Sequence, residues 1–212
     1  MIIAIDGSAA SGKGTLAKRL ARHFCLSYLD TGALYRLAGL KLLHAGQDPK
    51  NIDEYQCVKS CNELDITLTT SPLIRSEKVA EMASVIAAMP AVRAALLDLQ
   101  RQFAAAPPNS GGAILDGRDI GTVVLPDADI KFFIDADIHT RAERRTKELL
   151  QAGQSVMFHD VLTDMQERDA RDRSRLAAPL RPADDAIIID TSKMDPDGVV
   201  TLAVSHISAL SG

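Results

Sequence analysis

The chain has 212 residues, of which 46% are hydrophobic and 25% are charged, and its formal net charge is −4. This balance excludes a disordered chain, a collagen-like repeat and a coiled-coil rod. The acidic charge disfavours general nucleic-acid binding. No apolar run approaches the roughly 18–20 residues of a membrane span, and residues 1–6 lack the basic start of a signal peptide. Three cysteines without a Cys-x-x-Cys pair fit reduced thiols, so we expect a cytoplasmic protein.

Short apolar runs alternate with helical patterns along the chain. The strand-like runs cover residues 2–6, 26–30, 112–116, 130–135 and 186–190. The helical patterns between and after them cover residues 13–24, 32–45, 139–151 and the segment after Pro196. Apolar strands separated by helices are typical of a buried parallel sheet with right-handed crossovers. The predicted fold class is therefore α/β, with a five-stranded parallel sheet flanked by helices.

Two segments interrupt this alternation. Residues 46–107 hold helical patterns and one strand-like stretch at 65–70, and they are too long for a single crossover, so they predict an inserted subdomain. Residues 152–181 are rich in Arg and Asp and predict a flap, or lid. No linker separates the parts, so we expect one domain whose core comprises residues 1–45, 108–151 and 182–212.

A Gly- and Ser-rich loop follows the first strand and opens a helix. In Gly7-Ser8-Ala9-Ala10-Ser11-Gly12-Lys13-Gly14-Thr15, glycines let the backbone curl so that its N–H groups face phosphate oxygens. The helix N-terminus adds partial positive charge, and Lys13 would reach the outer phosphates. Gly14 stands where Ser or Thr usually follows the Lys, which leaves open which hydroxyl would bind Mg²⁺. The loop predicts a bound nucleoside triphosphate but not the reaction.

The guanine-binding motif of switch GTPases, Asn-Lys-x-Asp, has no match after the last strand. Ser192-Lys193-Met194-Asp195 comes near it but lacks the Asn. We interpret this segment as a turn and a helix N-cap.

Two polar segments form candidates for a second site. Thr31 and Arg36 lie five residues apart around a helix start, where an N-cap and a solvated Arg would also explain them. Asp116, Arg118 and Asp119 follow a strand, and ligands of open α/β sheets bind at the carboxyl ends of strands. A polar turn is the alternative there.

Arginines gather in the second half of the chain. Arg168, Asp172 and Arg175 would share one helix face at i, i+4 and i+7. A solvated ladder of ion pairs explains such a run without any ligand. A protein that binds several phosphates, however, needs guanidinium groups near them.

Taken in order, these blocks resemble the bacterial cytidylate kinase family. The resemblance covers nearly the whole chain through the phosphate loop, LDTGALYR, ASVIAAMPAVR, LDGRDIGTVVLPDA, RDARDRSR and APL. LDTGALYR together with DGRDIGTVV is highly specific, and Gly-Lys-Gly-Thr loops also occur among nucleoside monophosphate kinases. The resemblance implies MgATP-dependent phosphorylation of CMP and dCMP by a monomer that binds neither nucleic acid nor membrane. The connection at residues 71–75 is shorter than in many members, so we expect a reduced small sheet in the insert.

The resemblance also implies roles for individual residues. Gly7 to Thr15 would cradle the ATP phosphates, with the lid arginines Arg141 and Arg145 near ATP. The acceptor would bind Thr31, Arg36, Ser84, Arg93, Arg118, Asp119, Arg168, Asp172 and Arg175, with Ser84, Arg93 and Asp119 reading cytosine. The catalytic set would be Lys13, Arg118, Arg145 and Arg175. Independently of the resemblance, the candidates for binding Mg²⁺ are Thr15, the hydroxyl next to Gly14, and Asp116, whose place at a strand end puts it toward the phosphate loop.

Two other functions stay open on the sequence. One is a different phosphate-loop kinase, such as a shikimate or uridylate kinase. The other is a nucleotide-dependent switch without transfer activity, against which the missing guanine motif and the second candidate phosphate site argue. An acceptor screen for ADP formation separates these possibilities.

Overall fold

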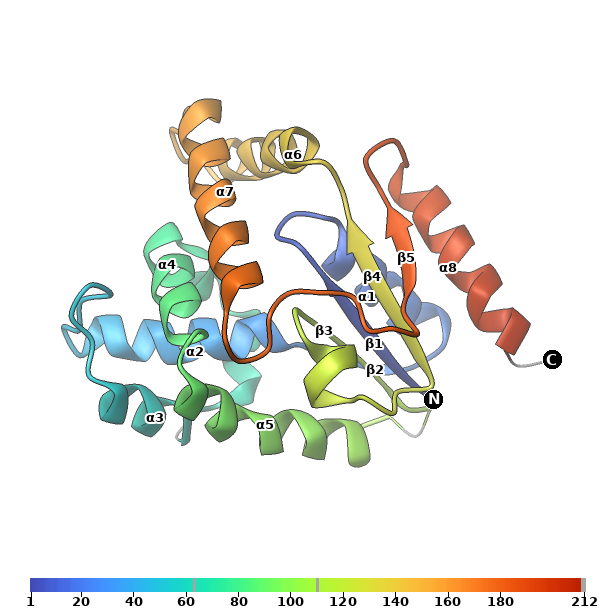
Figure 1. Cartoon of the computed structure of the whole chain (residues 1–212), viewed down its shortest axis with the longest axis horizontal. Helices are drawn as coiled ribbons and strands as arrows, with labels where there is room; N and C mark the ends of the chain where they lie inside the picture. Colours follow the sequence, from blue (N-terminus) through green and yellow to red (C-terminus); the bar gives the residue numbers. More distant parts are fainter. Residues whose placement is uncertain (63, 110, 211–212) are drawn as a thin grey trace. The chain divides into compact units, whose positions relative to one another are not determined.

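The computed structural model describes residues 1–62, 64–109 and 111–210 (Figure 1). The chain divides into two compact units. The first comprises Met1–Tyr28 with Pro108–Gly212, and the second comprises Leu29–Pro107. The second unit begins before residue 46, the predicted start of the insert, because the helix Thr31–His44 packs on later helices of the same unit. Residues 211–212, at the end of the predicted core, lie outside the described residues.

The first unit is built on the predicted parallel sheet. The five strands are β1 (Ile2–Gly7), β2 (Ser27–Asp30), β3 (Ala113–Gly117), β4 (Ile130–Asp135) and β5 (Ile187–Asp190). Their order is β2-β3-β1-β4-β5, and β1 pairs in parallel with both β3 and β4. β1 is central and almost wholly buried, which explains why its sequence is apolar on both faces instead of alternating.

Helices α1 (Lys13–His23) and α8 (Pro196–Leu210) cover one face of this sheet. Leu16 and Leu20 of α1 and Ile207 of α8 share a buried cluster with Ile3 and Phe132 of the strands. At about 25 cal/mol per Å² of apolar surface, such burial supplies most of the stabilisation of this unit. The predicted N-cap at the start of α8 is confirmed, because the Asp195 carboxylate accepts a hydrogen bond from the Gly198 N–H at 2.7 Å.

The strand register brings the loops of this unit to one edge of the sheet. Asp6 of β1 is level with Gly117 of β3, and Asp135 of β4 is level with Asp190 of β5. Because the strands are parallel, the loops that follow them emerge side by side.

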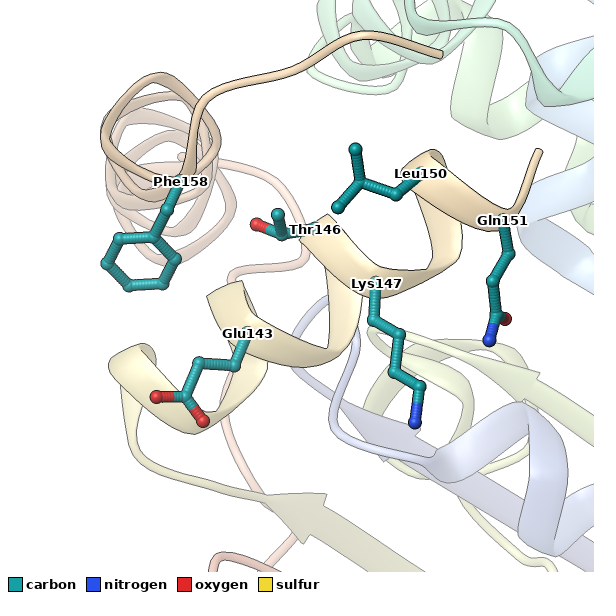
Figure 2. A pocket seen from close by; sticks show the side chains of 6 residues that line it. All are labelled: Glu143, Thr146, Lys147, Leu150, Gln151 and Phe158. Atoms are coloured by element: carbon teal, nitrogen blue, oxygen red, sulfur yellow. The ribbon is translucent and has the colours of Figure 1, made fainter. Parts of the chain in front are cut away.

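Two helices follow β4, α6 (Ile138–Gln151) and α7 (Phe158–Ser174), and they pack through Ala142, Leu149, Val161 and Met165. A groove of about 440 Å³ lies along α6 and the start of α7 (Figure 2). Its lining residues are Glu143, Thr146, Lys147, Leu150, Gln151 and Phe158. None of these was predicted as a site residue.

The second unit is helical, with α2 (Thr31–His44), α3 (Glu54–Asn62), α4 (Glu77–Ile86) and α5 (Pro90–Ala105). A Cβ on Gly39 of α2 would lie 3.3 Å from the Ala83 nitrogen of α4, so the glycine allows these two helices to approach closely. Cys57 and Cys61 are buried free thiols on α3. Within the part of the chain that the structure describes, no single helix has the length and apolar character of a membrane span, although the bent pair α4 and α5 meets that test together.

The prediction of a strand at residues 65–70 was wrong. A 3₁₀ helix occupies Ile66–Thr70, and a second one follows at Pro72–Arg75. The Asp65 carboxylate accepts hydrogen bonds from the Thr67 N–H at 2.9 Å and from its hydroxyl at 2.6 Å, and these local bonds favour a turn. Residues 46–62 and 64–107 contain one isolated bridge, Asp48 with Asn51, and no strand, so the expected small sheet is absent from the described part of this unit.

Candidate active site

The phosphate loop is shaped to face an anion. Ala10 and Gly12 have positive φ angles of 57° and 92°, and they turn the chain before α1 begins at Lys13. The helix has no side-chain cap and no acidic residue in its first turn, so its N–H groups are left for a ligand. The buried Ser11 hydroxyl has no hydrogen-bond partner within the described residues. The loop therefore fits a phosphate chain.

Lys13 lies over this loop, where its ammonium donates to the Ser8 carbonyl at 3.3 Å. This long bond is weak by geometry. A phosphate would offer the ammonium a stronger, charged acceptor.

The structure explains the glycine that follows the lysine. A Cβ on Gly14 would lie 3.2 Å from Oδ2 of Asp116, a buried carboxylate on β3. The Tyr28 hydroxyl donates to the same oxygen at 2.9 Å and holds it there. A serine at position 14 would press against a fixed carboxylate, so the usual hydroxyl is replaced here by close packing.

Asp116 is a suitable ligand for Mg²⁺, which prefers carboxylate oxygens, phosphate oxygens and water. The described residues contain no cluster of three His, Cys, Asp or Glu side chains that could hold a metal alone. Nucleotide phosphates and water would therefore complete the coordination. Thr15, the other predicted ligand, is exposed on α1.

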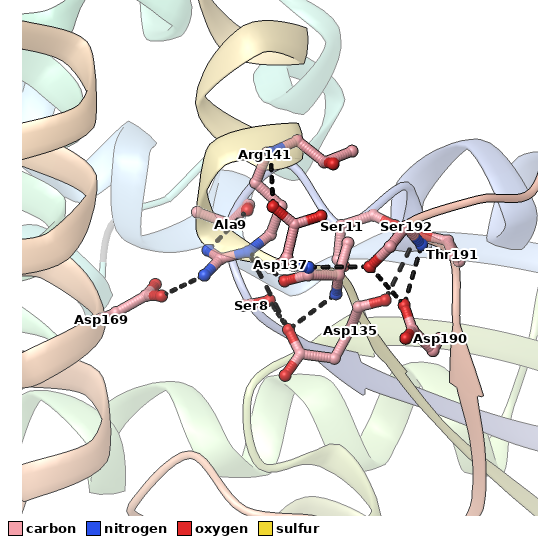
Figure 3. A network of polar contacts seen from close by, with 12 residues as sticks. Ser8, Ala9, Ser11, Asp135, Asp137, Arg141, Asp169, Asp190, Thr191 and Ser192 are labelled. Carbon is pink, nitrogen blue, oxygen red and sulfur yellow. Dashed lines mark hydrogen bonds and ion pairs between the residues drawn. The ribbon is translucent and has the colours of Figure 1, made fainter. Parts of the chain in front are cut away.

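A polar network ties the phosphate loop to the ends of β4 and β5 (Figure 3). The Ser8 hydroxyl donates to the Asp135 carboxylate. The Thr191 hydroxyl donates to the Ser11 carbonyl at 2.8 Å, and the Thr191 N–H donates to the Asp135 carbonyl at 2.8 Å. Asp135, the last residue of β4, and Thr191, directly after β5, thus fix the backbone of the loop.

Arginines of α6 extend this network. The buried Arg141 guanidinium donates to the Ala9 carbonyl at 3.3 Å, and it also pairs with Asp169 of α7 at 2.5 Å (Figure 3). Arg144 donates to the Thr191 hydroxyl at 3.0 Å and to its carbonyl at 2.7 Å. Arg145, by contrast, pairs with Glu148 at 3.2 Å on the partly exposed side of the helix. Helix α6 therefore supports the loop through Arg141 and Arg144.

A polar cavity of about 760 Å³ lies beside this network. Its lining includes Asp135, Asp137, Arg141, Asp169, Arg173 and Ser192. Oδ1 of Asp169 is buried and has no hydrogen-bond partner within the described residues. The cavity can accept a polar ligand next to the phosphate loop.

The predicted residues Arg118, Asp172 and Arg175 meet in one buried cluster. Arg118 Nε donates to Asp172 Oδ2 at 2.9 Å, and Arg175 donates to the other carboxylate oxygen. Burial alone would raise the pKa of Asp172, but the neighbouring charges of Arg118, Arg175 and Arg168 hold it below its usual value. The carboxylate is therefore an anion that holds two cations in place.

This cluster decides between the two interpretations of the arginine run. The Asp172 side chain is 2% exposed, so it is not part of a solvated ladder, whereas the Arg171–Glu167 pair is 4.0 Å long and exposed. Arg175 follows the last residue of α7, so it does not lie on the helix face on which we predicted it. It reaches Asp172 from the turn after the helix.

Four predicted acceptor residues lie in the second unit. Thr31 is buried at the start of α2, and Arg36 donates to the Ile74 carbonyl at 3.0 Å. The Ser84 hydroxyl on α4 is buried without a hydrogen-bond partner within the described residues. This hydroxyl is therefore able to bond to a ligand. Arg93 donates to the Ala87 carbonyl at 3.2 Å and stacks over the Tyr35 ring at 5.8 Å.

Comparisons with known proteins show the family of this chain. A family model described as cytidylate kinase matches residues 3–209. This chain belongs to the cytidylate kinase family. The cytidylate kinase of Paramagnetospirillum magneticum is 49% identical over 98% of both chains. That of Methylocella silvestris is 52% identical over 96% of this chain and 92% of its own. That of Rhodopseudomonas palustris is 50% identical over 99% and 97%.

Solved structures show the same fold at low sequence identity. An uncharacterized protein from Eubacterium ventriosum has a TM-score of 0.56 with 17% identity and covers 98% of both chains. A sugar kinase from Janibacter has a TM-score of 0.51 with 15% identity and covers 98% of this chain and 94% of its own. These likenesses concern the α/β fold alone.

Sequence reasoning missed several residues of this family member that support its site. Asp6, Tyr28, Asp169 and Thr191 each contact a predicted site residue or the loop that carries one. Asp6 had one local signal, since it directly precedes the phosphate loop. The others had none, because their partners are 28 to 180 residues away.

Proposed function

We propose that this member of the cytidylate kinase family transfers the γ-phosphoryl group of ATP to CMP and dCMP, giving ADP and CDP or dCDP. Family membership makes the chain a kinase of the nucleoside monophosphate class. The observation that carries the finer proposal is the buried Arg118–Asp172–Arg175 cluster in the same unit as the phosphate loop. It supplies a second set of cations, which a protein that binds one nucleotide would not need.

Phosphoryl transfer requires an in-line approach and neutralised phosphate oxygens. Lys13 and the N–H groups at the start of α1 would bind the donor phosphates. Mg²⁺, when bound beside Asp116 and Thr15, supplies further neutralisation of the phosphate charges. No strong general base is needed, because a phosphate oxygen of CMP is already an anion.

The main obstacle is repulsion between two polyanions. Arg118 and Arg175 would meet it on the acceptor side, together with Arg36 and Arg168. Asp172 orients Arg118 and Arg175 through hydrogen bonds to both of its oxygens. Arg145 is proposed near ATP, where it would exchange its exposed bond to Glu148 for a phosphate. Arg141 would act through its bond to the Ala9 carbonyl of the loop.

Cytosine recognition is proposed for Asp119, Arg93 and Ser84. A carboxylate accepts a hydrogen bond from the N4 amino group of cytosine, and a guanidinium donates to N3 or O2. Uracil presents O4 and N3–H at the same places. The carboxylate acceptor would then face the acceptor O4, and the guanidinium donor would face the donor N3–H. An unpaired buried group costs on the order of 1–3 kcal/mol, which favours CMP over UMP.

Water must be excluded during transfer, because ATP would otherwise be hydrolysed. We propose that residues 152–181 close over the bound nucleotides as a lid.

The proposed division of the chain has two further parts. The insert is residues 46–107, and the core is residues 1–45, 108–151 and 182–212. We propose that the enzyme is a monomer in the cytoplasm.

A coupled assay for ADP formation tests the function with CMP, dCMP, UMP and AMP as acceptors. We expect CMP and dCMP to give the highest kcat/KM and UMP to give a value lower by about tenfold or more. Preferred use of UMP, AMP or a non-nucleotide acceptor would indicate another phosphate-loop kinase. ATP binding without CMP-stimulated ADP release would indicate a switch or binding protein.

A further inference from the structure

Asp6 is a buried carboxylate that joins the phosphate-loop strand to a distant loop. It is the next-to-last residue of β1 and is 3% exposed. Its two oxygens accept hydrogen bonds from the Ile120 N–H at 2.7 Å and the Gly121 N–H at 2.8 Å. These amides lie 114 and 115 residues away along the chain. They directly follow Arg118 and Asp119.

The loop after β3 is a tight turn that needs such an acceptor. Residues Ile120–Val124 form a single π-helical turn, and the Asp119 carbonyl accepts from Val123 and Val124. The first N–H groups of a helical turn have no partner inside it. Asp6 supplies that partner. Gly121 lies close to this carboxylate, since a Cβ there would be in ordinary contact with Asp6 Oδ2 at 3.5 Å.

We propose that Asp6 is a positioning residue for acceptor binding, whose ionised carboxylate fixes the backbone that carries Arg118 and Asp119. This inference rests on the proposed function, in which both residues bind CMP. Asp6 itself touches no substrate. Through Asp6, strand β1, which precedes the phosphate loop, also fixes the position of the loop after β3 that carries Arg118 and Asp119.

The charge of Asp6 matters because both oxygens act as acceptors. Burial raises the pKa of Asp6 to about 7, against the two N–H bonds and Arg118, which lower it. The charged groups around it are Asp119 and Arg118 on the loop and Lys131 on β4, whose ammonium is held by Asp185 at 2.7 Å. A protonated carboxyl accepts two bonds less well, so the loop is held more weakly as pH falls below 7.

The test compares Asp6→Asn with wild type in steady-state kinetics and in calorimetric binding of CMP without ATP. Asn keeps the size of Asp but turns one acceptor into a donor that faces an N–H. We expect the KM and the Kd for CMP to rise about tenfold or more, with the KM for ATP within about threefold of wild type. Between pH 8 and pH 6, the KM for CMP should rise more in wild type than in Asp6→Asn.

Asp129→Asn is the matched control, because Asp129 accepts the Ile2 N–H at 2.7 Å at the opposite end of the same strand. The KM for CMP of this variant should equal that of wild type at each pH. If Asp6→Asn does not fold, Asp6→Glu keeps the charge but lengthens the side chain by one methylene, so it displaces the same two acceptor oxygens and should raise the KM for CMP selectively.

Two outcomes overturn the inference while leaving the proposed function standing. In the first, wild type phosphorylates CMP, but the variants change the KM values for CMP and ATP equally. In the second, the pH response of the KM for CMP is the same in wild type and Asp6→Asn. Absence of CMP phosphorylation by wild type would instead contradict the proposed function.

Discussion

Arg118, in the loop after β3, donates through Nε to the Asp172 carboxylate of α7 at 2.9 Å, and both side chains are largely buried. This contact links the loop that carries Asp119 to the helix of the proposed lid. Arg175 binds the second oxygen of the same carboxylate. One anion thus orients two of the cations that we propose for the acceptor phosphate.

Replacing Asp172 by Asn should lower both stability and acceptor binding. The change leaves Arg118 and Arg175 buried without their anion, which costs about 3–5 kcal/mol in the free energy of unfolding at pH 7. The pKa of Asp172 is lowered in the folded state, so its contribution is present above about pH 4, the usual Asp pKa, and is lost as pH falls through the folded pKa.

Urea unfolding of both proteins at neutral and acidic pH measures this effect. The difference between wild type and variant should shrink below about pH 4. Glu167→Gln on the same helix removes only an exposed partner of Arg171 and should stay within about 0.5 kcal/mol of wild type. Equal losses in the two variants would contradict the special place of Asp172.

Replacing Lys13 by Ala should nearly abolish turnover and leave the fold intact. Its ammonium donates to the Ser8 carbonyl at 3.3 Å, a long bond that contributes little to stability. Steady-state kinetics and circular dichroism check this prediction, with Lys147→Ala on α6 as the control. A folded variant that keeps more than about a tenth of normal turnover, a loss below about 1.4 kcal/mol, would remove Lys13 from the catalytic set.

Replacing Asp119 by Ala should reduce CMP use more than UMP use. The Asp119 carbonyl and the Asp6 carboxylate accept hydrogen bonds that shape the loop, and these bonds survive the change. CMP should lose a charge-assisted hydrogen bond of about 1.5–3 kcal/mol, whereas UMP loses little. The measurement is the ratio of kcat/KM for CMP over UMP, with Asp127→Ala as an exposed control in the same connection. An unchanged ratio with a lower Tm would assign Asp119 to the loop alone.

Replacing Gly14 by Ala should weaken MgATP use. The new methyl would meet Asp116 Oδ2 at 3.2 Å, and Tyr28 restrains that carboxylate from moving away. We expect kcat/KM for ATP to fall about tenfold or more, and to fall less when the change is made in a Tyr28→Phe background. Purely additive effects in the double variant would show that Tyr28 does not hold Asp116 against Gly14.

Replacing Thr191 by Val should raise the KM for ATP and spare that for CMP. The change keeps the shape but removes the hydroxyl that donates to the Ser11 carbonyl and accepts from Arg144. Losing these bonds costs about 1–3 kcal/mol in the free energy of unfolding. Thr201→Val removes an exposed hydroxyl on α8 and should leave both KM values unchanged. A parallel rise in both would contradict a role confined to the phosphate loop.

The parallel α/β core can be predicted from the amino-acid sequence, because wholly apolar strands can be satisfied only in a sheet covered on both faces. The phosphate loop can also be predicted, because its glycines and lysine act through local backbone chemistry. The apolar alternation at residues 65–70 predicted a strand, and this prediction was wrong. The local hydrogen bonds of Asp65 favour a 3₁₀ helix there.

Which charged side chains are buried could not be predicted from the sequence and follows from the packing of distant segments. The residues around Asp172 are compatible in sequence with a solvated ladder of ion pairs and with a buried cluster. The contact of Asp172 with Arg118 in the loop after β3 shows that the cluster is buried. The same holds for Gly14, whose meaning depends on Asp116 of a distant strand, and for Asp6, whose partners lie more than a hundred residues away. Burial and long-range hydrogen bonds depend on which distant segments pack together, and the spacing of residues along the chain does not indicate these contacts.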